Sequence, residues 1–90
     1  MDYLRKKRVV AVNNPIENRI INVVAGILNT DPAQITSLST RREYPQWDSM
    51  QNLNIVLGLE QEFDINIPSS SFEDIDGISA LVKIVMSLKE

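Results

Sequence analysis

The chain has 90 residues, of which 43% are hydrophobic and 23% are charged, and its formal net charge is −3. Such a length can bury the core of one domain, and the composition is typical of a globular protein rather than of a disordered tail. Cysteine and histidine are both absent, which excludes disulfides, zinc fingers and every catalytic arrangement that depends on either residue. We therefore expect a protein that is not itself an enzyme.

The charge is unevenly distributed. Residues 1–14 contain four basic residues and one acidic residue, and we expect them to form a basic, flexible N-terminal extension to a helical domain of residues 15–90. That domain contains five basic and eleven acidic residues, so its net charge of −6 disfavours nucleic acid as a partner. The extension is expected to be a solvated tail, with binding to an anionic surface as the alternative. No apolar run approaches the length of a membrane span, and no secretory signal is evident, so we expect a cytoplasmic protein.

The first predicted element is an amphipathic helix over residues 15–29. Asn14 is a suitable N-cap, Pro15 suits the first helical position, and Glu17 completes a capping box. Apolar residues follow at helical spacing, at Ile16, Ile20, Val23, Ile27 and Leu28. Pro32 ends the helix, because a proline disfavours helical geometry in the residue before it.

Residues 32–47 show no persistent period and are predicted to form a long loop anchored by Ile35 and Leu38. A second helix is predicted to begin at Asp48-Ser49, with Asp48 as its cap and Gln51 completing a capping-box-like pair. Its apolar stripe is predicted to consist of Met50, Leu53, Val56, Leu57 and Phe63, with Ile55 and Leu59 beside it.

The rest of the chain completes a helical fold. Gly58 indicates close packing of the second helix against another helix. Ile65 and Ile67 alternate in an extended connector, and residues 69–71 begin a short helical turn that carries Phe72 and Ile75. The last helix follows Asp76-Gly77 and has an apolar face of Ile78, Leu81, Val82, Val85 and Leu88. The sequence therefore predicts an all-α fold, a small four-helix bundle of three longer helices and one short helical turn, with a long loop between the first and second helices.

Ser49 has a distinctive electrostatic setting. At the first position of a helix the backbone N–H groups lack intrahelical partners, and the macrodipole is positive there. A phosphate or phosphodiester on the Ser49 hydroxyl would be stabilised by this field. By itself, however, an Asp-Ser pair is most simply a helix start. Glu73, Asp74 and Asp76 fit no regular oxygen-ligand loop, so we expect a solvated acidic turn and no metal site.

The surroundings of Ser49 resemble the acyl carrier protein family. Asp48-Ser49-Met50 matches the D-S-L core of the family, residues 59–63 (LEQEF) match the acidic end of the helix after it, and Ile67-Pro68 matches the following turn. The resemblance covers roughly residues 15–88. It implies that a separate phosphopantetheinyl transferase attaches 4′-phosphopantetheine from coenzyme A to Ser49, and that Asp48 helps this enzyme to recognise the site.

The resemblance also implies how the protein is used. The thiol of the arm would hold an acyl or aminoacyl group as a thioester, loaded by a ligase and used by downstream synthase or transferase enzymes, and we expect a monomer. Met50, Leu53, Val56 and Leu57 match the face that meets cargo and partner enzymes, with core packing as the alternative for each. Trp47 either flanks the attachment point or pins the loop onto the bundle.

Two departures from the family pattern point to a specialised member. Fatty-acid carriers typically have acids two and five residues after the serine, where this chain has the neutral Gln51 and Asn54. Trp47 also stands where housekeeping members commonly have a small residue. Because charged docking sets partner choice, these differences suggest a dedicated pathway for a natural product, a modified lipid or a surface polysaccharide. The alternative from another class is a small helical adaptor that binds a partner through Met50 and Leu57 without a prosthetic group.

Overall fold

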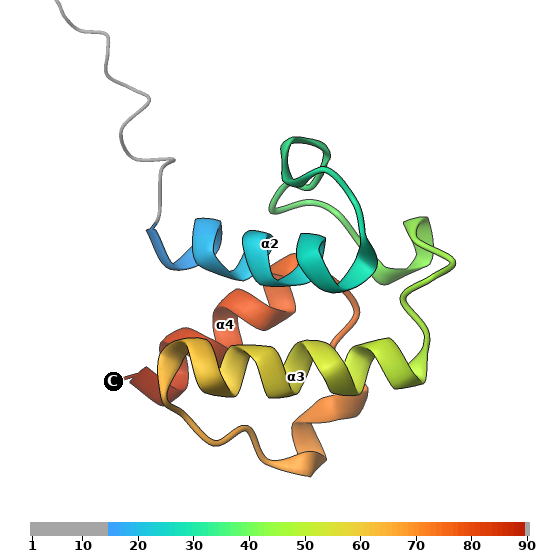
Figure 1. The fold of residues 1–90 in the computed structure, drawn as a ribbon. Coiled ribbons are helices and arrows are strands. Elements are labelled where there is room, and N and C mark those ends of the chain that lie inside the picture. Colours follow the sequence, from blue (N-terminus) through green and yellow to red (C-terminus); the bar gives the residue numbers. More distant parts are fainter. Residues whose placement is uncertain (1–14, 90) are drawn as a thin grey trace, which may run out of the picture.

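The computed structural model of the chain describes residues 15–89 (Figure 1). These residues form three α-helices, α2 (Pro15–Leu28), α3 (Ser49–Phe63) and α4 (Ile78–Lys89), and the short 3-10 helices η2 (Pro32–Gln34), η3 (Arg41–Glu43) and η4 (Ser69–Asp74). The predicted all-α fold of three longer helices, a short helical turn and a long first loop is confirmed. The predicted N-terminal extension and the Asn14 cap lie outside the described residues.

The core lies where the three α-helices meet. Helix α2 packs against both α3 and α4, and Figure 1 shows α4 passing behind the other two. The side chains that are almost completely buried come from all three helices and from the connector before α4; they are Ile20, Val24, Ile55, Val56, Leu59, Ile75, Ile78, Leu81 and Val85. No helix within residues 15–89 is long and apolar enough to cross a membrane.

Helix α3 is rotated relative to the prediction. Its buried residues are Asn52, Ile55, Val56, Leu59 and Phe63, whereas Met50, Leu53 and Leu57 are exposed. The predicted apolar stripe was therefore wrong in phase, although Val56 and Phe63 belong to both stripes. Apolar residues occupy both faces of this helix, so their spacing alone could not indicate which face is buried.

The predicted close packing at Gly58 is confirmed. A Cβ atom at this position would lie 2.9 Å from Cγ1 of Val23 and 3.4 Å from Cδ1 of Ile27, both on α2. Glycine therefore allows α2 and α3 to approach closely in the middle of the bundle.

The long loop is anchored differently from the prediction. Ile35 is buried as expected, but Leu38 is 84% exposed, so its predicted anchoring role is wrong. The neighbouring Ser39 is buried instead, and its carbonyl oxygen accepts a hydrogen bond from the N–H of Ile78 at 3.1 Å. A backbone bond joins the loop to the start of α4 because it satisfies a main-chain carbonyl that burial would otherwise leave without water.

The connector between α3 and η4 runs as predicted. Ile67 is buried and Ile65 packs against the core from its edge. The backbone N–H of Ile67 donates to a carboxylate oxygen of Glu60 at 2.8 Å, which fixes the connector to the end of α3. Short helix η4 follows at the position of the predicted helical turn, and it packs against α3.

Candidate site at the start of helix α3

Helix α3 begins at Ser49, and Asp48 is its N-cap. The Oδ1 atom of Asp48 accepts a hydrogen bond from the N–H of Gln51 at 2.9 Å, and the Asp48 carbonyl accepts one from the N–H of Asn52 at 2.8 Å. The predicted capping-box-like pair is only half formed, because the Gln51 side chain accepts from Asn54 Nδ2 at 2.8 Å instead. The side chain of Asp48 therefore caps the helix, and the Ser49 hydroxyl is not needed for capping.

Ser49 is exposed at the first position of α3. Its hydroxyl makes no hydrogen bond to any other residue in the described range 15–89. The first N–H groups of a helix point along its axis without intrahelical acceptors, and the macrodipole adds partial positive charge at the same place. The hydroxyl is therefore accessible, and its setting stabilises an anionic group attached to it.

Trp47 pins the end of the long loop to the bundle. The side chain is only 3% exposed, and its indole Nε1–H donates to Oδ1 of Asn52 at 2.9 Å. Asn52 is 6% exposed, and its Nδ2 donates in turn to the carbonyl oxygen of Phe72 at 3.3 Å. This network joins the loop, α3 and η4, so Trp47 pins the loop onto the bundle, which is one of the two roles that the sequence left open for it.

Asn52 is the residue of the site that sequence reasoning missed. A polar residue in a helix is usually exposed, and nothing in the local pattern marks this one as the partner of a tryptophan. Its spacing of three and four from Ile55 and Val56 was the available signal, because those two residues define the buried face.

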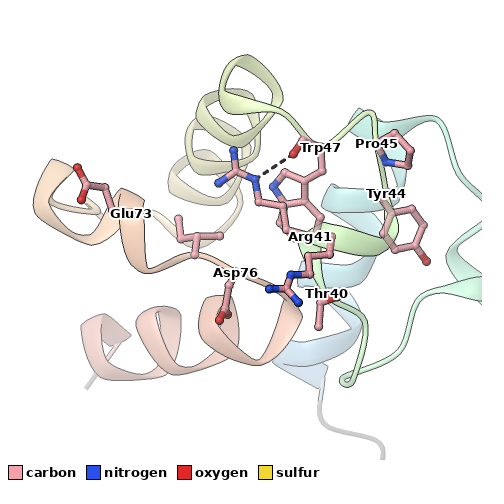
Figure 2. A pocket seen from close by; sticks show the side chains of 9 residues that line it. Thr40, Arg41, Tyr44, Pro45, Trp47, Glu73 and Asp76 are labelled. Carbon is pink, nitrogen blue, oxygen red and sulfur yellow. Dashed lines mark hydrogen bonds between the residues drawn. The ribbon is translucent and has the colours of Figure 1, made fainter.

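A groove lies beside Trp47, between the long loop and the segment before α4 (Figure 2). It is open to solvent, has a volume of about 770 Å³ and is lined by Thr40, Arg41, Arg42, Tyr44, Pro45, Trp47, Glu73, Ile75 and Asp76. Arg41 is fixed in its wall, because its Nε donates to the carbonyl oxygen of Trp47 at 2.9 Å. The other charged side chains that line the groove are Arg42 of the loop and Glu73 and Asp76 of the segment before α4.

The exposed face of α3 is apolar and neutral near Ser49. Met50 is 67% exposed, Leu57 49% and Leu53 41%. Val56 and Trp47 are buried, so of the five residues expected at the partner and cargo face only Met50, Leu53 and Leu57 are exposed on the outside of the bundle. The neutral Gln51 and Asn54 lie on the same turns of the helix.

The acids at the far end of α3 are occupied by contacts within the bundle. Glu62 forms an ion pair with Arg19 of α2 at 2.8 Å, and Glu60 receives the connector N–H described above. Within residues 15–89, no group of three or more acidic side chains is arranged to hold a metal ion, so Glu73, Asp74 and Asp76 do not form such a group.

The chain is similar to curated proteins over most of its length, although no family model matches it. It is 30% identical over 78 residues to the acyl carrier protein of Rickettsia typhi, and the matched region covers 87% of this chain and 91% of the relative. It is 31% identical over 70 residues to the acyl carrier protein of Caulobacter vibrioides, spanning 78% and 90% of the two chains. The acyl carrier protein of Phenylobacterium zucineum is 31% identical over 67 residues, or 74% and 85%.

Proposed function

The chain belongs to the acyl carrier protein family, and on this premise we propose that Ser49 is the attachment site for 4′-phosphopantetheine. Acyl carrier proteins are non-enzymatic carriers, so this protein carries acyl intermediates and leaves their chemistry to other enzymes. When attached, the arm supplies a thiol that binds the acyl group as a thioester. In the modification the Ser49 oxygen bonds to the phosphorus of coenzyme A that bears the pantetheine, the pyrophosphate P–O bond breaks, adenosine 3′,5′-bisphosphate leaves, and the hydroxyl proton passes to the transferase.

The observation that carries this proposal is the free, exposed hydroxyl of Ser49 at a helix start that Asp48 already caps. A phosphodiester at this position is stabilised electrostatically by the positive N-terminal end of α3. No hydrogen bond within residues 15–89 must be broken to release the hydroxyl. Asp48 is exposed, and its carboxylate accepts one hydrogen bond from the helix. We assign to it a second role, in which it helps the phosphopantetheinyl transferase to recognise the site.

The partner enzymes are proposed to dock on the apolar face of Met50, Leu53 and Leu57. They comprise the transferase, an acyl- or aminoacyl-loading ligase and the downstream synthase or transferase enzymes of a dedicated pathway. The neutral Gln51 and Asn54 support a specialised pathway, because a surface without acids matches a basic docking patch poorly. Residues 15–90 are proposed to form the carrier domain and 1–14 an extension to it, and the protein is proposed to act as a monomer.

The modification can be tested by intact-protein mass measurement. The full chain is incubated with coenzyme A and a broad-specificity phosphopantetheinyl transferase, and a mass gain of one phosphopantetheine group is expected. Ser49→Ala should abolish the gain. Ser79→Ala is the matched control, because Ser79 is also an exposed serine in the first turn of a helix, and it should keep the gain.

Two results would contradict the proposal. An unmodified wild-type chain would favour the alternative, a helical adaptor that binds a partner through Met50 and Leu57 without a prosthetic group. A mass gain that survives Ser49→Ala would place the attachment site on another residue.

A further inference from the structure

Building on the proposed function, we propose that the cargo is a short, polar acyl group displayed outside the bundle, and not a long aliphatic chain enclosed within it. The inference rests on the two buried residues that flank Ser49, Trp47 before it and Asn52 one turn after it. Together they occupy and close the region of the core nearest to the attachment point.

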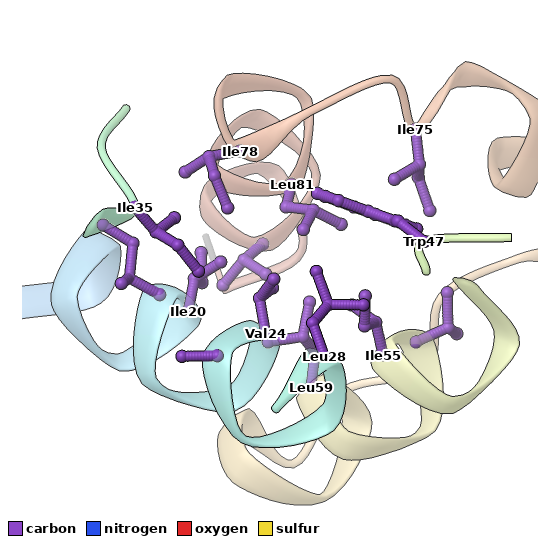
Figure 3. Packing of buried hydrophobic residues seen from close by; sticks show 14 of the residues in the cluster. Ile20, Val24, Leu28, Ile35, Trp47, Ile55, Leu59, Ile75, Ile78 and Leu81 are labelled. Atoms are coloured by element: carbon purple, nitrogen blue, oxygen red, sulfur yellow. The ribbon is translucent and has the colours of Figure 1, made fainter. Parts of the chain in front are cut away.

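The indole of Trp47 fills space that a chain entering the core beside Ser49 would need. Figure 3 shows the ring extending from the loop into the core cluster toward Leu81, with Ile75 and Ile55 on either side of it in this view. Protein interiors are packed with few voids larger than a water molecule. An alkyl chain can therefore enter beside Ser49 only if the indole moves out.

The hydrogen bonds of Asn52 hold the indole and the neighbouring elements in place. Moving the ring outward breaks the 2.9 Å bond between the indole N–H and Asn52. Separating α3 from η4 breaks the 3.3 Å bond from Asn52 to the Phe72 carbonyl. Either movement leaves a buried polar group without its partner, and methylene groups cannot replace that partner. The start of α3 therefore resists an aliphatic guest.

The surface beside Trp47 offers charged and polar partners to a short acyl group. The groove that Trp47 borders is lined by Arg42 of the long loop and by Glu73 and Asp76, which come shortly before α4. Arg42 forms no ion pair with any residue in the described part of the chain. Hydroxyl or amino groups on a short acyl unit would find both donors and acceptors among these charged side chains.

The test compares carriers that differ only in the cargo. A broad-specificity phosphopantetheinyl transferase transfers the acyl-phosphopantetheine phosphate from acetyl-, butyryl-, hydroxybutyryl- or decanoyl-coenzyme A to Ser49 and releases adenosine bisphosphate, so each thioester stays intact. The melting temperature, the emission of Trp47 and the rate of thioester cleavage by hydroxylamine are then measured. Trp47 is the only tryptophan of the chain, so its emission reports directly on the region in question.

We expect acetyl and decanoyl carriers to melt at the same temperature, with unchanged emission and cleavage rates within about twofold, because a displayed thioester is equally accessible at every chain length. Enclosure would give the opposite result, since each methylene removed from water shifts the folding equilibrium by about fourfold. A melting temperature that rises with chain length would overturn the proposal. So would the absence of chemical-shift changes at Arg42 and Asp76 in the hydroxybutyryl carrier relative to the butyryl carrier.

A variant of Trp47 provides a second test. Trp47→Ala should open a space of the size of an indole, and a decanoyl group, but not an acetyl group, should then raise the melting temperature of the variant. Equal melting temperatures of the two loaded variants would show that the indole does not hold the site closed. If the variant fails to fold, the wild-type series decides alone. Failure of loading would refute the proposed function, whereas loading with chain-length dependence would refute only the inference about cargo.

Discussion

Replacement of Asn52 by alanine tests whether the network beneath Ser49 stabilises the fold. The variant loses the 2.9 Å bond from the Trp47 indole and the 3.3 Å bond to the Phe72 carbonyl. The Phe72 carbonyl still accepts a hydrogen bond from the N–H of Ile75 at 3.3 Å. In the variant the indole N–H of Trp47 is therefore the buried group that is left without an acceptor. Such a group costs about 1–3 kcal/mol and the second bond about 1 kcal/mol, so we expect a loss of about 2–4 kcal/mol.

Asn54→Ala is the matched control for this measurement. It makes the same chemical change in the same helix, so the gain in helix propensity, about 0.5 kcal/mol, cancels between the two variants. Asn54 is exposed, and within residues 15–89 its side chain bonds only to the Gln51 side chain, at 2.8 Å, so its removal should change stability by less than about 0.5 kcal/mol. The difference between the variants therefore isolates the buried network.

Urea unfolding followed by far-UV circular dichroism measures both variants. The expected loss is a large part of the 5–15 kcal/mol typical of a domain, so the midpoint of Asn52→Ala should fall clearly while the slope stays that of the wild type. The emission of Trp47 in the folded state should also shift to longer wavelength in Asn52→Ala and not in Asn54→Ala. Equal midpoints for the two variants would refute the reasoning.

Three other substitutions test the packing and the proposed docking face. Gly58→Ala brings a Cβ to within 2.9 Å of Val23, whereas the control Gly26→Ala meets nothing within 4 Å. Urea unfolding should therefore find Gly58→Ala less stable than Gly26→Ala by about 1–3 kcal/mol. Equal stability of the two variants would contradict the packing argument. Gly77→Ala places a Cβ 2.7 Å from a backbone carbonyl of the long loop, and calorimetry should show a melting temperature lower by about 5 °C or more. Leu57→Glu should slow modification of Ser49 by the transferase about tenfold in kcat/KM with stability changed by less than about 0.5 kcal/mol, and an unchanged rate would exclude Leu57 from the docking face.

The elements of the fold could be predicted from local chemistry. Pro15 and Pro32 bracket the first helix, which ends at Leu28 with Asn29 in the left-handed conformation at φ 57°. Asp48 was predicted to cap α3, and it does so through the N–H of Gln51. Prolines and N-caps act within one turn of their own position, so their effects can be predicted without the rest of the chain.

The candidate site could be predicted in part for the same reason. The position of Ser49 at a helix start depends only on its neighbours, and the matching residues around it indicated the family. The sequence could not indicate whether Trp47 lies outside or inside, because an indole is stable in either place if its N–H finds an acceptor. That acceptor is Asn52, and its burial is decided by how α3 is rotated in the bundle.

The sequence by itself therefore determined where the helices begin and end and which serine stands at a helix start, because these depend on contacts between residues close in the chain. Only the tertiary structure decided which apolar face of α3 is buried. It also decided that Ser39 rather than Leu38 anchors the long loop. Both outcomes depend on contacts with α2, η4 and α4, which are distant in sequence, and apolar spacing in α3 was compatible with either face.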